Sequence, residues 1–309
     1  TLFRSSAASD VYKRQTADDI TKATDPANGS IQKLYAEDTN LNIFQEFKVS
    51  RALIDKDAIF TAEGNPAVTA SNLVIGVIQP LPGKYGISQN PESFAVYGNN
   101  KYFTDKFNNV VMSLRGGGLV EISQLGMRDF FRDQLNDLDT GNLLGQCIGG
   151  WDIYNQQYVL SLQPANETKG SNKTFNTVTY DEGVQGWTSL FDYEPSQIIS
   201  IRNKMYTTGI KTQGFGNAQG LFEHYSLNVP RGQFYGDDFP STITVIFNPE
   251  PTRSKTFSTV SYEGANGWFV RSMVSDQTGL NQNPSTGLYA NSVDSINSVL
   301  SYYEGEYVI

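Results

Sequence analysis

The sequence predicts an all-β, mainly antiparallel protein built of propeller-like or tandem β-sheet modules, with one connector helix near residues 124–136. Three observations predict this class: many short segments rich in β-branched and aromatic residues, Gly, Asn and Asp residues between these segments, and an internal repeat. Aromatic residues make up 12% and charged residues 18% of the 309 residues, a composition that is typical of a folded chain and not of a disordered one.

The chain is expected to have three parts. Residues 1–15 are interpreted as a sequencing or assembly scar and not as native protein, because residues 1–5 and 10–15 can be back-translated to library adapter and transposase ends. Residues 16–92 are expected to form an N-terminal β segment with an extended polar start. Residues 93–309 are expected to form repeated antiparallel β modules that are incomplete at the C-terminus.

The stretch from residue 94 to residue 114 gives the clearest strand pattern. Strands are predicted at residues 94–97, 101–104 and 110–114, because each is rich in β-branched or aromatic residues. The residues between them include Gly, Asn and Asp, which suit tight turns. The pattern therefore indicates a meander of short strands, such as a propeller blade.

One helix is predicted, with Ser123 as its N-cap. Apolar residues recur at helical spacing after this serine, and charged residues occupy the other face. The helix is expected to pack on the sheets as a connector. Its apolar positions are Met127, Phe130, Phe131, Leu135 and Leu138.

An internal repeat links two segments that lie 82 residues apart. Residues 177–182 run to Gly186-Trp187, and residues 259–264 run to Gly267-Trp268. Each copy reads as a hairpin with an acidic turn. Repeated sheets produce such echoes because each sheet must bury one face against the next. One irregular β-sandwich, or a string of small β-domains, is the alternative interpretation.

Charge and composition exclude several classes of function. The net charge of −9 argues against nucleic-acid binding, which needs clustered Lys and Arg. The sequence contains no run of about 18 apolar residues, so no membrane-spanning helix is expected. With Cys147 and His224 as the only cysteine and histidine, the chain cannot form an internal disulfide or a structural zinc site, and no cofactor is expected.

Paired carboxylates are the strongest sign of catalysis, since glycoside hydrolysis uses two carboxyl groups at a fixed separation. All of the candidates lie in predicted turns, where Asp is favoured because its side chain bonds to nearby backbone groups. A role in turns is therefore preferred to catalysis, and the protein is predicted not to be an enzyme. The candidate carboxylates are Asp181, Glu182, Asp237, Asp238 and Glu263.

The tryptophans and two nearby tyrosines form a candidate interaction surface. Each Trp follows a Gly in a comparable position, which favours packing in a module core or at a subunit interface. A platform that stacks against sugars is the alternative. The residues are Trp151, Trp187, Trp268, Tyr180 and Tyr262.

Several segments resemble a known group of proteins. They lie at residues 32–40, 52–57, 85–94, 101–106 and 126–132, with later ones at 149–152, 248–251 and 260–264, so that the resemblance covers most of residues 31–309. They resemble large virion structural proteins of tailed bacteriophages, particularly those abundant in marine and gut metagenomes. The resemblance implies a tail, baseplate or neck component and carries no catalytic residues.

The sequence thus predicts a structural component of a tailed-phage virion that acts through protein–protein assembly. The expected partners are other virion proteins, in a homo- or hetero-oligomer, and a host surface glycan as a further candidate. The expected location is the phage particle, assembled in the host cytoplasm. One alternative is a receptor- or glycan-binding, adhesin-like module, and a second is a glycan-degrading enzyme that uses the paired carboxylates.

Overall fold

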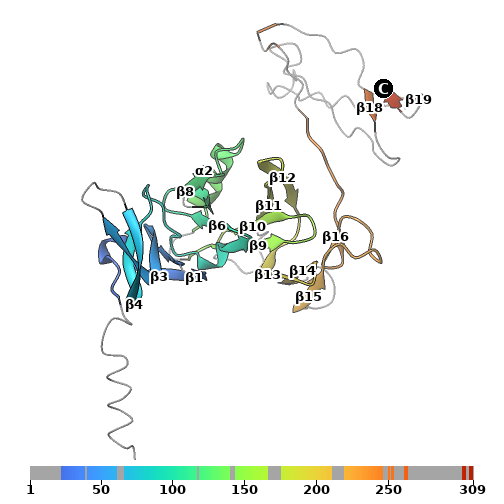
Figure 1. Cartoon of the computed structure of the whole chain (residues 1–309). Helices are drawn as coiled ribbons and strands as arrows, with labels where there is room; N and C mark the ends of the chain where they lie inside the picture. The colour runs from blue at the N-terminus through green and yellow to red at the C-terminus, as the bar shows by residue number, and fades with distance from the viewer. Residues whose placement is uncertain are drawn as a thin grey trace, which may run out of the picture. The chain divides into compact units, whose positions relative to one another are not determined.

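The computed structural model describes residues 22–38, 40–60, 66–116, 118–139, 143–165, 175–210, 219–245, 250, 252–253, 261–263, 301–303 and 306–308. The chain divides between Ser241 and Thr242 into two compact units. All paired strands are antiparallel and form several small sheets (Figure 1), which confirms the predicted fold class. The described residues form tandem sheets and not a propeller.

The first unit contains four consecutive sheets, and within each of them the strands follow one another in chain order. Two single-turn 3-10 helices, η1 (Pro26–Asn28) and η2 (Pro91–Ser93), precede the first and second sheets. A two-residue ribbon of β16 (Gln233–Phe234) and β17 (Asp237–Asp238) follows the fourth. The sheets are β1 (Ile31–Glu37), β2 (Asn40–Gln45), β3 (Val49–Phe60) and β4 (Pro66–Pro80); β5 (Ala95–Tyr97), β6 (Asn100–Asp105), β7 (Val110–Arg115) and β8 (Gly118–Glu121); β9 (Gln146–Asp152), β10 (Gln157–Gln163), β11 (Asn176–Asp181) and β12 (Gly186–Phe191); and β13 (Pro195–Ile201), β14 (Lys204–Ile210) and β15 (Gln219–Glu223).

The predicted connector helix is α2, Arg128–Asn136, and it begins later than the sequence suggested. The prediction that Ser123 caps it is wrong, because the Ser123 hydroxyl donates a hydrogen bond to Glu121 and Met127 occupies the N-cap position. Gly126 has a φ of 79°, which ends the preceding turn and excludes a continuous helix from residue 124. Phe131 and Leu135 are the buried residues of α2.

The second unit contains a small sheet with the strand order β18-β20-β19. Its strands are β18 (Ser261–Glu263), β19 (Ser301–Tyr303) and β20 (Glu306–Val308). Of the second copy of the predicted repeat, only β18 is described, and it pairs with β20. The expected return strand at Gly267-Trp268 lies outside the described residues.

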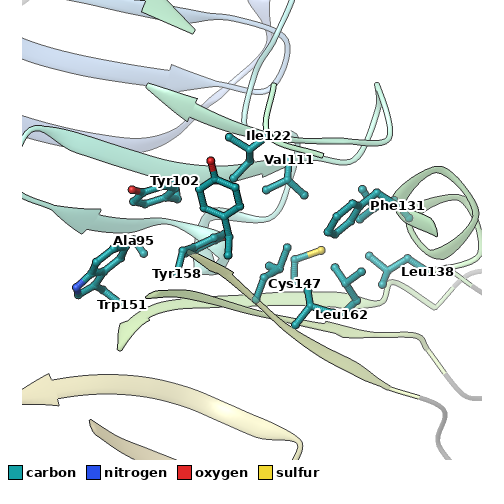
Figure 2. Packing of buried hydrophobic residues seen from close by; sticks show 14 residues of the cluster. Ala95, Tyr102, Val111, Ile122, Phe131, Leu138, Cys147, Trp151, Tyr158 and Leu162 are labelled. Atoms are coloured by element: carbon teal, nitrogen blue, oxygen red, sulfur yellow. The ribbon is translucent and has the colours of Figure 1, made fainter. Parts of the chain in front are cut away.

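The second and third sheets of the first unit are buried on both faces. In β6, Tyr102 packs into a core with the third sheet and α2, whereas the next residue, Phe103, packs into a core with the first sheet. In β10, Tyr158 packs toward the second sheet (Figure 2), and the next residue, Val159, packs toward the fourth. Because side chains alternate between the two faces of a strand, each middle sheet joins its two neighbours. The four sheets therefore form one continuous series of shared cores.

Two adjacent glycines in β9 allow close approach on both of its faces. A Cβ atom on Gly149 would lie 2.0 Å from the carbonyl oxygen of Ser93, and one on Gly150 would lie 2.4 Å from the Ile198 side chain. Real Cβ atoms do not come this close to other heavy atoms, so a larger residue at either position forces a neighbour to move. The Gly149-Gly150 pair thus sets how tightly β9 packs against η2 and β13.

We predict that Gly149→Ala destabilises the protein by about 1–3 kcal/mol, as overpacking in a dense core does. The clash is with backbone atoms, which cannot rotate away. Gly118→Ala in β8 is the matched control, because a Cβ there meets nothing within 4 Å. Urea unfolding of both variants measures the difference. Equal free energies of unfolding for the two variants would show that β9 does not pack closely on η2.

Candidate functional site

A stack of aromatic rings joins the second and third sheets. Trp151 of β9 stacks on Tyr97 of β5, with 4.2 Å between ring centroids, and on Tyr102 of β6 at 5.5 Å. Tyr102 in turn stacks on Tyr158 of β10 at 4.9 Å. Rings from the two sheets thus alternate along the stack, and such offset pairs stabilise beyond the area they bury. Neither sheet can slide past the other without breaking these contacts.

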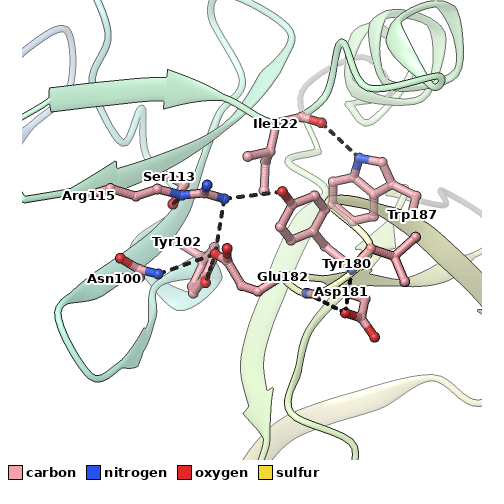
Figure 3. Close-up of polar contacts among 11 residues, drawn as sticks. Asn100, Tyr102, Ser113, Arg115, Ile122, Tyr180, Asp181, Glu182 and Trp187 are labelled. Atoms are coloured by element: carbon pink, nitrogen blue, oxygen red, sulfur yellow. Dashed lines mark hydrogen bonds and ion pairs between the residues drawn. The ribbon is translucent and has the colours of Figure 1, made fainter.

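One carboxylate joins the polar side of the same junction (Figure 3). Glu182, in the turn after β11, accepts a hydrogen bond from Arg115 at the end of β7, with 3.0 Å between the two atoms. The same oxygen, Oε1, also accepts from the Tyr102 hydroxyl and from the Asn100 side chain. Arg115 donates a second hydrogen bond to the Tyr180 hydroxyl at 3.1 Å. Charged hydrogen bonds of this kind are stronger than neutral ones, and this set ties the third sheet to the second.

Tyr102 and Tyr158 stay protonated and serve as donors. Burial, with the charge of Glu182 beside it, raises the pKa of Tyr102 well above its ordinary value. Burial likewise raises the pKa of Tyr158, whose hydroxyl donates to the Ser93 carbonyl at 2.7 Å. Both hydroxyls therefore hold their protons, and hence their hydrogen bonds, at neutral pH.

Three of the five predicted interaction-surface residues lie in or against this junction. Trp151 and Tyr180 are buried in its core, and Trp187 packs against it, with 4.5 Å between its ring and that of Phe131. Trp187 Nε1 also donates to the Ile122 carbonyl at 3.0 Å. Tyr262 belongs to β18, and Trp268 lies outside the described residues. The first three residues thus pack within the chain, and a surface made by all five stays a prediction.

A second set of polar contacts ties the first sheet to the second. The Lys101 ammonium is almost fully buried, contacts the Glu37 carboxylate and lies 5.7 Å from the centre of the Tyr35 ring. Its hydrogen bond to Glu37 holds the pKa of that carboxyl below its ordinary value. At the other end of β6, the buried Asp105 accepts hydrogen bonds from the Gly86 N–H and from the Ser88 hydroxyl, each at 3.0 Å. A buried charge is stable only when paired in this way.

A third polar cluster lies between the third and fourth sheets. Asp152, which is buried at the end of β9, accepts a hydrogen bond from the Tyr225 hydroxyl at 2.6 Å. His224 Nε2 lies 2.7 Å from the Thr207 hydroxyl, which also bonds with Tyr235 at 2.9 Å. Burial lowers the pKa of His224 to about 4, against the opposing charge of Asp152. The imidazole is therefore neutral at neutral pH.

Three of the five carboxylates considered for catalysis, Asp181, Glu182 and Asp238, have structural partners. Asp181 Oδ1 accepts from the backbone N–H groups of Gly183 and Val184, at 2.7 and 3.1 Å, which is the turn role that the sequence predicts. Glu182 belongs to the junction, and Asp238 bonds with Gln233 across the β16–β17 ribbon. In the described ranges, no group of three or more His, Cys, Asp or Glu side chains is placed to hold a metal ion.

Sequence reasoning missed the residues that link the sheets by charge. Glu182 was noticed only as a turn or catalytic candidate, and Arg115, Lys101 and Glu37 were not singled out. The available signal is small: each is a charged residue at or near a strand end, with a large apolar or aromatic residue one or two positions away. Such positions are partly buried, so a charge there requires a partner.

The C-terminal part of the chain is similar to a known virion domain. Residues 229–309 match the family model described as the Crassvirus muzzle protein C-terminal domain. The match covers about a quarter of the chain, and a search of curated proteins finds none that matches. The match confirms the predicted resemblance to phage virion structural proteins as a class.

Among the described residues, no helix has the length and apolar character needed to cross a membrane.

We predict that Glu182→Ala lowers the free energy of unfolding by about 1–3 kcal/mol, because Arg115 and the Tyr102 hydroxyl lose their shared acceptor. A double-mutant cycle with Arg115→Met measures how much of this loss belongs to the pair. Glu223→Ala is the control, since its ion pair with Lys204 is exposed and is expected to have little effect. A coupling energy of zero between Glu182 and Arg115 would contradict the assigned role.

We predict that stability falls as the pH is lowered from about 6.5 to about 4, partly through His224. Its pKa is lower in the folded chain than in the unfolded one, so in this window the unfolded chain binds more protons. The contribution is up to about 3 kcal/mol. His224→Gln removes it, and unfolding curves at several pH values should show a smaller loss for the variant. The same pH dependence in both proteins would refute the assignment.

Proposed function

We propose that this protein is a structural subunit of a crassvirus particle that belongs to the muzzle and works by assembling with other virion proteins. The observation that carries the proposal is the match of residues 229–309 to the muzzle C-terminal domain. The resemblance of most of residues 31–309 to tailed-phage virion proteins points to the same class. Assembly would take place in the host cytoplasm, with the finished particle as the final location.

The packing of the first unit supports a mechanical role. Its four sheets share three cores, and charged or polar side chains tie each sheet to the next. A series of sheets joined in this way transmits force without local unfolding, since no sheet can move independently of its neighbours. The acidic surface keeps free subunits soluble and suits basic partner surfaces.

Neither alternative has a comparable basis in the described residues. Sugar stacking by tryptophan would require exposed rings, whereas Trp151 and Trp187 are packed against the junction. Glycan cleavage would require two free carboxylates facing one cleft, whereas Asp181 and Glu182 are engaged in a turn and an ion pair. Assembly is therefore the function that the contacts favour.

We predict that an antibody against residues 22–245 labels purified crassvirus particles that carry this protein, and that the label lies at the muzzle. Immunogold electron microscopy of the particles makes the measurement, and particles of an unrelated tailed phage are the control. Labelling elsewhere on the particle would overturn the muzzle placement. Protein found only in host lysate, and not in purified particles, would overturn the structural role.

A further inference from the structure

Two phenyl rings lie exposed where the first and second sheets of the first unit meet. Phe47, in the turn after β2, is 46% exposed, and Phe107, in the turn after β6, is 52% exposed. Their ring centroids are 5.0 Å apart, so the two rings form one apolar surface. Single exposed apolar residues are common, whereas adjacent ones that form a patch mark contact surfaces. Aromatic anchors of this kind supply much of the binding energy at protein interfaces.

Three lysines lie around these rings. Lys48 and Lys106 are each next in the chain to one of the rings. Lys48 donates a hydrogen bond to the carbonyl of Gly83 at 2.5 Å, which brings the neighbouring Lys84 close. Lys106 forms an ion pair with Asp139, so Lys48 and Lys84 supply most of the uncompensated positive charge. The two phenyl rings and the three lysines are here called the aromatic–lysine patch.

The carboxylates of the same turns are engaged within the chain. Asp105 is fully buried and accepts a hydrogen bond from the Ser88 hydroxyl at 3.0 Å. The Ser88 oxygen in turn accepts from the Phe107 N–H at 3.1 Å, which fixes the backbone under that ring. Glu46 accepts hydrogen bonds from the N–H and the hydroxyl of Ser30. The patch therefore presents preorganised rings and amines to a partner, and preorganisation lowers the entropic cost of binding.

An acidic cluster lies at the fourth sheet of the same unit, where the β16–β17 ribbon packs on the connection between β12 and β13. The ring of Phe234 in the ribbon contacts the rings of Phe191 and Tyr193, at 5.9 and 5.1 Å, and these two residues flank the exposed Asp192. Arg231, just before the ribbon, offsets only part of the negative charge. The members of the acidic cluster are Asp192, Glu194, Asp237 and Asp238.

The two surfaces are suited to each other but cannot meet within one chain. The aromatic–lysine patch belongs to the first two sheets and the acidic cluster to the last two, and the shared cores keep this series of sheets from folding back on itself. A symmetric contact between two patches, or between two acidic clusters, would oppose like charges. Contact between unlike surfaces of two copies pairs opposite charges and is heterologous.

We propose that the aromatic–lysine patch of one copy binds the acidic cluster of a second copy, with Lys84 beside Asp192 and the phenyl rings at the centre of the contact. Each copy then has one surface of each kind, so copies join head to tail. The charged side chains select and orient the partner, and the rings supply the apolar contact. The proposal rests on the assembly role given above and names the contact that performs it.

Charge reversal with rescue tests the pairing in the full chain. Lys84→Glu and Asp192→Lys change exposed residues, and each should weaken self-association at least about tenfold in sedimentation equilibrium. An equimolar mixture of the two variants should restore association, because the reversed charges then face each other. Arg128→Glu on α2 is the control, since this exposed residue lies outside both surfaces and should leave association unchanged. Failure of the mixture to restore association would overturn the pairing.

The apolar part of the contact has its own test. Phe107→Ser should weaken self-association at least about tenfold, whereas Val184→Ser should not, although Val184 is 71% exposed in the turn after β11. Equal association of these two variants, or an unmodified chain that stays monomeric at millimolar concentration, would overturn the proposal. Virion labelling is independent of these results, so the assembly role and the head-to-tail contact can fail separately.

Discussion

The face-to-face contact between the second and third sheets is the interaction on which the first unit depends. It joins a stack of four rings, from Tyr97 to Tyr158, to a single carboxylate that accepts hydrogen bonds from three side chains. The stacked rings hold the apolar side of this contact, and Glu182 fixes the register of one sheet on the other. The opposite face of the second sheet packs on the first sheet, and the opposite face of the third sheet packs on the fourth, so the other two cores of the unit adjoin this contact.

Burial on both faces explains much of the sequence. A strand that packs on two sides needs large apolar side chains at successive positions, as in Tyr102-Phe103 and in Tyr158-Val159-Leu160. Polar residues within such strands must then be paired, and Lys101, Asp105 and Asp152 each have the partners that burial requires. Within these strands few positions are free to face water, so charged residues are rare there.

The sequence predicted local structure well because short-range chemistry determines it. The strands of the second and third sheets follow from their β-branched and aromatic residues, and the strands β6 and β14 each follow a two-residue turn. The prediction at Ser123 failed because a serine can bond to nearby side chains as readily as it caps a helix. The Glu182–Arg115 pair could not be predicted, since its partners lie 67 positions apart and only the packing of the two sheets brings them together.

The central claim is that the second and third sheets open as one unit, and native-state hydrogen exchange tests it most directly. The account predicts one common free energy of opening for the central amides of β6 and β10, equal to that of global unfolding. Exchange in β6 at a free energy lower than that of β10 by more than about 1 kcal/mol would contradict it, because the sheets would then unfold separately.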